Sequence, residues 1–203
     1  EPMVAEPVSG QIDRWRMTVE EWRALERESH DVRHEYIDGY VYAMARGTQA
    51  HAYIGFNVAR ALDAALGDGP CIVYAFDVVA RLSDDRYTYP DVVVTCGEGA
   101  AVAKREETEV DVPRVVIEVL SDSTERYDRG RKFSYYQECE SLQEYVLVTT
   151  EYQSVEVTRR LADGWGLFRA YGPGDEVELV SIGVRFPVAA LYRRTDVPES
   201  PAV

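Results

Sequence analysis

Two carboxylates lie beside short runs of β-branched residues, where a folded chain rarely leaves a charge without a partner. Asp91 follows Pro90 and opens an apolar run at residues 92–94, and Glu118 lies inside a second run at residues 115–120. Both runs are typical of buried β-strands. Burying a carboxylate in such a run is unfavourable unless a cation or hydrogen-bond donors accompany it. If the two strands are neighbours, Asp91 and Glu118 create a site that attracts a cation.

Oxygen ligands of this kind suit one or two Mg²⁺ (or Mn²⁺) ions, which bind few carboxylates and retain several waters. The backbone carbonyl of Val119 would add a further oxygen. Lys132 follows on the helix expected after the Glu118 strand, four residues beyond Asp128 on the same helical face. Bound metal activates water and stabilises phosphoryl oxygens, so this combination predicts phosphodiester hydrolysis, with Lys132 orienting the water or offsetting phosphate charge. Tyr136, one turn further along, would contact the same site.

Capping and turn signals define the elements that must position these residues. Thr18 and Glu21 form a capping box that starts a helix, and Asp38 and Gly39 form a hairpin turn. Hydrophobic periodicity places the remaining elements. The predicted order is a helix at 19–27, a hairpin at 33–44, a helix at 47–67, strands within 71–82, 89–95 and 114–120, a helix at 128–138, a strand at 144–149, a hairpin at 154–171, a strand at 176–179 and a closing helix at 187–192. This order predicts an α/β fold with a mixed sheet at its centre.

Length and composition indicate a single globular domain. With 203 residues, 46% of them apolar and 29% charged, the chain can build one full hydrophobic core, and a split into two domains is not expected. We predict a leader at residues 1–16, one domain at 17–192 and a tail at 193–203. No apolar run approaches the roughly 18 residues that a membrane span requires, so no membrane association is expected. The first residues also lack the basic segment and apolar core of a secretory signal.

The three cysteines, Cys71, Cys96 and Cys139, are odd in number and widely spaced. No pair has the spacing of a zinc site, and a disulfide framework is not expected in a chain of this length. We therefore expect reduced, mostly buried thiols. Together with the missing secretory signal, this predicts a cytoplasmic protein.

The overall charge argues against tight, non-specific binding to nucleic acid. The chain has 22 Lys and Arg against 36 Asp and Glu, a formal net charge of −14, whereas nucleic-acid-binding domains usually carry a basic surface. Net charge governs solubility and association rather than fold, and a local basic face can exist on an acidic protein. The candidate for such a face is the helix after Glu118, which carries Arg126, Arg129, Arg131 and Lys132.

In combination, these blocks resemble the Uma-two family of restriction endonucleases, bacterial proteins of the PD-(D/E)XK nuclease superfamily. The resemblance covers residues 17–191. It implies a restriction-endonuclease-like fold, with a central mixed β-sheet flanked by helices and an added N-terminal helix and β-hairpin. The motifs that carry it are Tyr89-Pro90-Asp91-Val92-Val93-Val94, Ile117-Glu118-Val119-Leu120-Ser121, Asp128, Lys132-Phe133, Tyr136 and Glu144-Tyr145-Val146-Leu147-Val148.

The resemblance also implies roles for individual residues. Asp91 and Glu118 match the two acidic positions of the family motif and would be the catalytic metal ligands. Leu120 stands where the superfamily often has lysine, and the family pattern points to Lys132 instead. Glu35 matches an N-terminal acidic position that can complete the metal shell, and His51 matches a position at the start of the next helix. Arg131 departs from the family, which often has glutamate before the lysine.

Each of these residues also has an ordinary structural interpretation. Asp91 could cap a turn after proline, and Glu118 could form an internal salt bridge. Lys132 could pair with its neighbour Asp128 on a solvated helix face. Glu35 could face outward from its hairpin, and His51 could be an ordinary polar residue at a helix start.

Three functions remain open on the sequence alone. The first is a Mg²⁺-dependent endonuclease acting on DNA. The second is a catalytically inactive nuclease fold that serves as a binding or regulatory protein, which the acidic balance favours. The third is a metal-dependent hydrolase of a small phosphate ester. Sheet edges and abundant aromatic residues favour a homodimer, and nucleases of the superfamily often pair to cut both strands.

Overall fold

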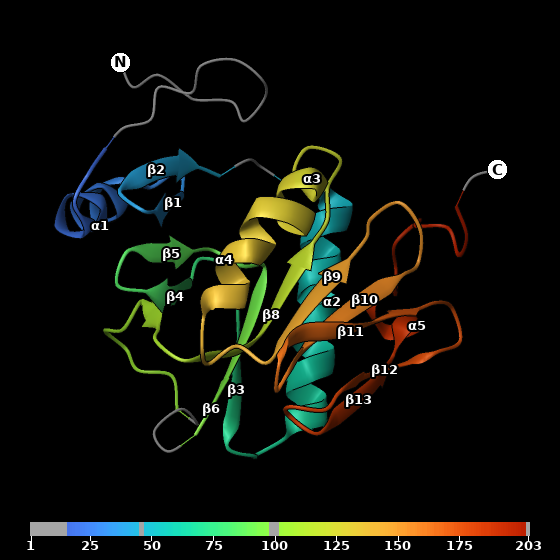
Figure 1. Cartoon of the computed structure of the whole chain (residues 1–203). Helices are drawn as coiled ribbons and strands as arrows, with labels where there is room; N and C mark the ends of the chain where they lie inside the picture. Colours follow the sequence, from blue (N-terminus) through green and yellow to red (C-terminus); the bar gives the residue numbers. More distant parts are fainter. Residues whose placement is uncertain (1–15, 45–46, 98–101, 202–203) are drawn as a thin grey trace.

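The computed structural model describes residues 16–44, 47–97 and 102–201 (Figure 1). Its helices are α1 (Val19–Glu28), α2 (Gln49–Leu66), α3 (Glu125–Tyr127), the π-helical turn η1 (Asp128–Lys132), α4 (Phe133–Glu138) and α5 (Val188–Leu191). Its strands are β1 (His34–Ile37), β2 (Tyr40–Ala43), β3 (Cys71–Ala75), β4 (Val79–Ser83), β5 (Arg86–Thr88), β6 (Val92–Cys96), β7 (Glu109–Val110), β8 (Pro113–Val119), β9 (Glu144–Val148), β10 (Val155–Leu161), β11 (Gly164–Tyr171), β12 (Glu176–Leu179) and β13 (Val184–Pro187).

A six-stranded mixed sheet forms the centre of the molecule, as the sequence predicts. Its strand order is β11-β10-β9-β8-β6-β3, and β8 pairs with β9 in parallel while the other neighbours are antiparallel. In Figure 1 the helix α2 lies behind this sheet and the α3-η1-α4 segment lies in front of it. The predicted α/β fold, a mixed sheet flanked by helices, is confirmed.

Successive side chains of a strand point to opposite faces of the sheet, and both faces of the central strands are apolar. Each face is therefore covered by a helix. On one face an i, i+4 stripe of α2, Ile54, Val58 and Leu62, packs on Val92 and on other buried residues of β6, β8 and β9. The opposite face holds Val93, Val116, Tyr145 and Leu147, which pack beneath Tyr136 of α4. Glu118 follows Val116 by two residues and therefore belongs to the α4 face.

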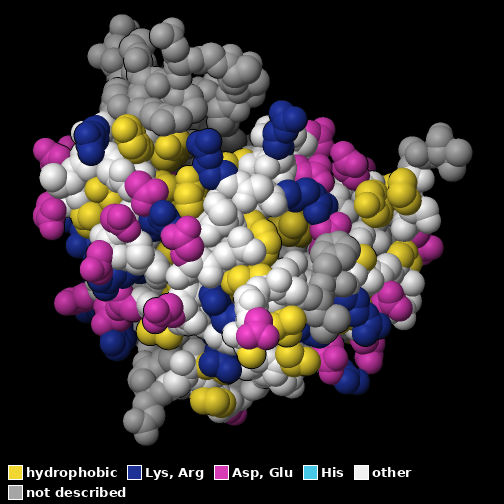
Figure 2. Space-filling view, in the orientation of Figure 1, with side chains coloured by type: hydrophobic (Ala, Val, Ile, Leu, Met, Phe, Trp, Pro, Cys, Tyr) yellow, Lys and Arg dark blue, Asp and Glu magenta, His cyan; other side chains and the backbone are white. Residues whose placement is uncertain are grey.

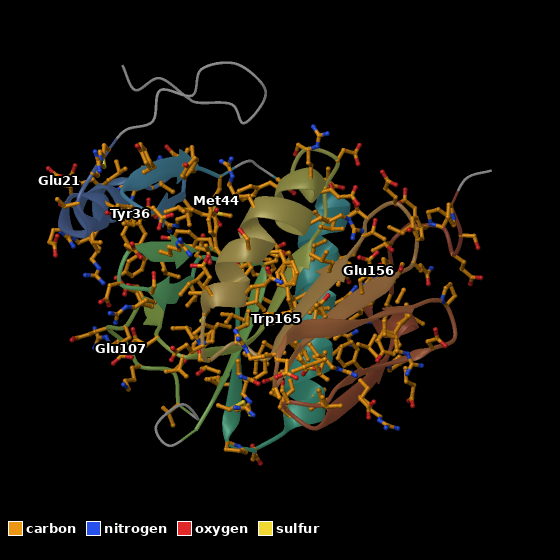
Figure 3. The ribbon with its side chains drawn as sticks, in the orientation of Figure 1. Glu21, Tyr36, Met44, Glu107, Glu156 and Trp165 are labelled. Carbon is orange, nitrogen blue, oxygen red and sulfur yellow. A yellow bond between two sulfur atoms is a disulfide. The ribbon has the colours of Figure 1, made fainter. Side chains whose placement is uncertain are left out.

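The N-terminal helix and hairpin add a second sheet, with strand order β2-β1-β5-β4-β7. The predicted capping box is present, since the side chains of Thr18 and Glu21 each accept a backbone N–H of the other residue. Helix α1 buries Trp22 against the rings of Tyr36 and Tyr87; Figure 3 marks Tyr36 in this unit. This packing holds β1, the strand that carries Glu35, beside β5 of the same sheet.

Several boundaries differ from the predicted ones. The strand predicted at 89–95 begins only at Val92, which leaves Asp91 in a bend before the strand. The helix predicted at 128–138 begins at Glu125 and contains the π-helical turn η1. Strands β5, β7 and β13 were not predicted: β5 and β7 are only three and two residues long, and β13 pairs with β12 as a separate two-stranded sheet.

The ends of the predicted domain can be compared with the structure only in part. The predicted leader, residues 1–16, lies outside the described residues except for Arg16. In the predicted tail, Val197 is buried and the carbonyl of Pro198 accepts a hydrogen bond from the backbone of Gln153. None of the helices in the described chain combines the length and apolarity of a bilayer span.

The prediction of three reduced cysteines is wrong for two of them. Cys71 and Cys96 form a disulfide between β3 and β6, whereas Cys139 is free and buried. The two residues are directly opposite each other in the antiparallel register, with their Cα atoms 4.0 Å apart. Such pairing depends on strand register across 25 residues of sequence, which spacing alone does not show. The cysteines therefore no longer support a cytoplasmic location.

Candidate active site

A buried lysine lies at the centre of the residues that the sequence singled out. The ammonium Nζ of Lys132 is 2.8 Å from Oε1 of Glu118, 3.0 Å from Oε1 of Glu35 and 3.9 Å from Oδ1 of Asp128. All four side chains are about 5% exposed. Buried ions need partners of opposite charge, so the structure assembles one ammonium with three carboxylates from β1, β8 and η1.

The π-helical turn explains how Asp128 and Lys132 both point inward. Both residues of η1 are buried, and π-helical insertions are frequent at functional sites because they redirect side chains of an otherwise regular helix. The hydroxyl of Tyr145 donates to the backbone carbonyl of Asp128 at 3.0 Å and fixes the turn on the sheet.

Tyr136 reaches the same carboxylate from the next turn of the helix. Its hydroxyl donates to Oε1 of Glu118 at 2.7 Å and lies 3.1 Å from Oγ1 of Thr88. The predicted contact between Tyr136 and the site is therefore present in the structure. Oε1 of Glu118 thus accepts from two donors, Tyr136 and Lys132.

Asp91 lies beside Glu118 at the end of the central sheet. The register Val92↔Ile117 continues by one pair to bring Asp91 opposite Glu118, so both carboxylates occupy the same end of β6 and β8. Because Asp91 precedes the strand, its side chain replaces a ladder hydrogen bond: the backbone N–H of Val119 donates to Oδ2 of Asp91 at 2.7 Å. Asp91 and Glu118 thus lie at the same end of β6 and β8, and Glu118 contacts the ammonium of Lys132.

His51 approaches this corner from the opposite side of the sheet. Thr48 caps α2 by accepting the backbone N–H of His51 at 3.2 Å, which fixes the first helical turn. Nε2 of His51 is 3.3 Å from Oδ2 of Asp91. The imidazole thus contacts the Asp91 carboxylate, although His51 also stands in the first turn of α2.

Glu35 uses both of its carboxylate oxygens within the protein. Oε1 contacts Lys132 and accepts the backbone N–H of Tyr89 at 3.2 Å, and Oε2 accepts the hydroxyl of Tyr127 at 3.2 Å. The side chain therefore faces inward from β1. In this arrangement Glu35 acts as a counter-ion of Lys132, and its predicted part in a metal shell stays a prediction.

Asp91 and Glu118 are the acidic pair that could hold a metal ion. In the described ranges, no three or more His, Cys, Asp or Glu side chains come together as a metal-binding group. The hydrogen bonds and ion pairs of these two acids engage Oδ2 of Asp91 and Oε1 of Glu118, so the other oxygen of each acid is the candidate metal ligand. Two carboxylate oxygens at one end of the sheet suit a hard cation such as Mg²⁺, which needs few protein ligands.

The electrostatics of the site follow from burial and close charges. Burial raises the pKa of Glu118 well above its usual range, and the neighbouring Asp128 and Asp91 raise it further against the lowering effect of Lys132. Burial lowers the pKa of Lys132, but Glu118 and Glu35 outweigh burial, so its pKa is raised and the ammonium stays charged. Since one ammonium serves several acidic side chains, a bound cation would favour the ionised form of Glu118.

His51 gives the site a pH dependence that stability measurements can detect. Burial lowers the pKa of His51, but Asp91, the Val119 carbonyl and Asp128 outweigh it and raise the pKa above its ordinary 6.5. A raised folded pKa means that protonated His51 stabilises the protein below pH 6.5 and that this contribution is lost as pH rises through the folded pKa. In EDTA we therefore expect the melting temperature to fall over this window, and to fall less in His51→Gln. Identical pH profiles for both proteins would contradict the His51–Asp91 pairing.

Three site residues were not among the predicted ones. The i, i+4 spacing between Asp128 and Lys132 is the sequence signal for Asp128. Tyr127 and Tyr89 contact Glu35 through a hydroxyl and a backbone N–H. Sequence carries no signal for these two, because their contacts join segments about 50 to 90 residues apart.

Charges outside the cluster form no broad basic field on the face shown in Figure 2, where Lys and Arg side chains lie among Asp and Glu. On the candidate basic helix, Arg129 is paired with Glu125 and with Glu156, which Figure 3 labels. Arg126 and Arg131 are exposed and form no ion pair with any described residue. These two arginines remain available to an anionic ligand.

The chain matches one protein family, and it is similar to two bacterial proteins and to one solved structure. The family model described as "Uma2: Putative restriction endonuclease" matches residues 19–189. An uncharacterized protein of Synechocystis sp. is 36% identical over 175 residues, covering 85% of this chain and 88% of that protein. A second uncharacterized Synechocystis protein is 28% identical over 164 residues, covering 80% and 92%. A crystal structure from Anabaena variabilis, described as "a putative nuclease belonging to DUF820", shares the fold with a TM-score of 0.70 at 17% identity, covering 87% of this chain and 97% of that one.

Proposed function

The chain belongs to the Uma2 family, and from this premise we propose that it is a Mg²⁺-dependent endonuclease that hydrolyses phosphodiester bonds in DNA. One observation carries the proposal: Asp91 and Glu118, far apart in sequence, lie at one end of the same sheet beside the buried ammonium of Lys132. Buried carboxylates with perturbed pKa values beside a specific charge partner are typical of catalytic sites. Nuclease chemistry is consistent with the family and with the fold.

The metal ligands would be Asp91 and Glu118, together with the backbone carbonyl of Val119. One or two Mg²⁺ or Mn²⁺ ions would stabilise charge on the phosphoryl oxygens and lower the pKa of water when bound. Lys132 keeps its proton and its charge because Glu118 and Glu35 flank it. It therefore orients water or phosphate as a cation.

The remaining residues would position these groups. Tyr136 holds Oε1 of Glu118 and thereby leaves Oε2 for the metal. Glu35 holds Lys132, and it would join the metal shell as an accessory ligand only if the ammonium moved away. His51 contacts the Asp91 carboxylate. When a cation binds, His51 would either move away from Asp91 or share this carboxylate with the cation.

The DNA substrate would be held through its phosphates. Arg126 and Arg131 lie on the segment that carries Lys132 and are free of internal ion pairs among the described residues, so they are suited to phosphate contacts. A single site cuts one strand, and a homodimer would place two sites on a duplex. Action on DNA would place the protein in the cytoplasm.

The direct test is a plasmid-nicking assay with the purified chain. We expect supercoiled DNA to be converted to nicked and then linear forms in Mg²⁺ or Mn²⁺, and no conversion in EDTA. Cleavage that persists in EDTA would contradict metal dependence.

A second candidate is a nuclease fold that binds or regulates without turnover, which the net charge of −14 favours. It predicts intact plasmid under all metal conditions, although the site can still bind metal. The assay therefore separates the two candidates, whereas a metal titration alone does not.

A further inference from the structure

Two consecutive residues between β3 and β4 adopt a backbone conformation that L-amino acids rarely occupy. The φ angles of Phe76 and Asp77 are 58° and 51°, and neither residue is glycine. The left-handed region is unfavourable for residues with a Cβ atom. Such conformations persist only where the surrounding structure enforces them, and they cluster at functional sites. This turn therefore merits a functional explanation.

Burial does not explain the strained turn. Phe76 is 43% exposed, and the side chain of Asp77 is 71% exposed. A large apolar ring gains little from folding when it remains in solvent. The strained turn thus leaves a partly exposed aromatic ring at the surface.

The ring lies next to the candidate active site. The backbone N–H of Phe76 donates to the carbonyl of Asp91 at 3.2 Å, which continues the β3–β6 register by one pair. The ring rests on Gly55 of α2, where an added Cβ would lie 3.2 Å from Cε1 of Phe76. Gly55 is one turn beyond His51 on the same helical face, and His51 contacts Asp91. The backbone of Phe76 is therefore bonded to Asp91, the residue proposed to bind the metal, and its ring packs on the helix that carries His51.

We propose that Phe76 stacks on a nucleobase beside the phosphodiester bond that is cleaved, an inference that rests on the proposed function. A phenyl ring offers no hydrogen bonds, so it accepts any base by its π-face. The contact requires a base that is unstacked from its neighbour, which favours single-stranded or distorted DNA. Stacking also contributes affinity that does not depend on phosphate charge, which suits a protein of net charge −14.

The first test measures binding without turnover. A fluorescein-labelled single-stranded DNA with phosphorothioate linkages is titrated with the full chain in Mg²⁺, and fluorescence anisotropy gives the Kd. We expect Phe76→Leu to raise Kd by about 5- to 100-fold, the effect of one lost base–aromatic stack, while Phe76→Trp keeps the affinity. Phe56→Leu is the matched control, because Phe56 is similarly exposed at 50% but its ring contacts Tyr53, and its Kd should stay within about twofold.

A second variant separates stacking from a structural role. Phe76→Gly removes the ring and also relieves the strained φ angle, since glycine adopts positive φ freely. We expect a higher melting temperature together with weaker DNA binding. If the ring mainly supported the fold, both stability and binding would fall, and the inference would be overturned.

The remaining outcomes distinguish this inference from the proposed function. Unchanged Kd in Phe76→Leu, an equal loss in Phe56→Leu, or no DNA binding by the wild-type chain would each overturn the role of Phe76. Binding that depends on Phe76 without cleavage of unmodified DNA would support the stacking contact and contradict hydrolysis. If the wild-type chain cleaves DNA and Phe76→Leu binds DNA normally, the result would support hydrolysis and contradict the stacking contact.

Discussion

Replacing Glu118 with glutamine is expected to abolish metal-dependent nicking of plasmid DNA while leaving the protein folded. The substitution keeps the shape of the side chain and the acceptor for Lys132 and Tyr136, but it removes the charged oxygen proposed for the metal. The loss of one catalytic metal ligand should reduce the rate by at least about 1,000-fold, which corresponds to about 4 kcal/mol. Asp91→Asn should behave in the same way. The measurement is the initial nicking rate in saturating Mg²⁺, with the melting temperature of each variant beside it.

A buried glutamate on the adjacent strand provides the matched control. Glu144 is 1% exposed and is bound to Arg159 and to the backbone of Ser181, and its Cα is paired with that of Val115 on β8. Glu144→Gln should lower stability, because it weakens a buried ion pair, but its folded fraction should still cleave DNA. Equal cleavage by Glu118→Gln and the wild-type chain would refute the assignment of Glu118.

The second large effect is expected for Lys132→Met, which removes the ammonium and keeps an unbranched side chain of similar length. Glu118 and Glu35 would then be buried without their cation, and breaking a buried pair in this way typically costs about 3–5 kcal/mol. We expect that loss in urea unfolding at pH 7, together with loss of nicking. The destabilisation should shrink at lower pH, because protonation neutralises the two carboxylates left without a partner.

A compensated variant separates the two effects of Lys132. Combining Lys132→Met with Glu35→Gln and Glu118→Gln removes the two carboxylates nearest the lost ammonium and leaves only Asp128, 3.9 Å from Nζ in the wild-type protein, so part of the stability should return while cleavage does not. If Lys132→Met alone kept full stability, the claim that Lys132 neutralises buried carboxylates would be contradicted. If it kept full cleavage, Lys132 would have no catalytic role.

Local sequence rules were sufficient for much of the fold. Thr18 and Glu21 predict the start of α1, and Asp38 and Gly39 predict the first hairpin, since capping boxes and hairpin turns involve only neighbouring residues. The family pattern was also identified, and the matching family model bears it out. Carboxylates in apolar runs indicated the site because an uncompensated buried charge is so unfavourable.

Features that depend on tertiary pairing were not accessible to the same reasoning. The Cys71–Cys96 disulfide follows from strand register, and the link between Glu35 and Lys132 joins two sheets through a helix. The π-helical turn that buries Lys132 has no clear sequence signal. Phe76 was missed for a related reason, since a phenylalanine between two strands predicts burial and not a strained, exposed turn.

The central claim, that Asp91 and Glu118 together bind a divalent cation, is tested most directly by a crystal soaked in Mn²⁺. We predict an anomalous-difference peak at the end of β6 and β8, with carboxylate oxygens of both residues about 2.1 Å away. The peak should vanish in crystals of Glu118→Gln. A well-diffracting wild-type crystal with saturating Mn²⁺ and no peak between these two side chains would contradict the claim.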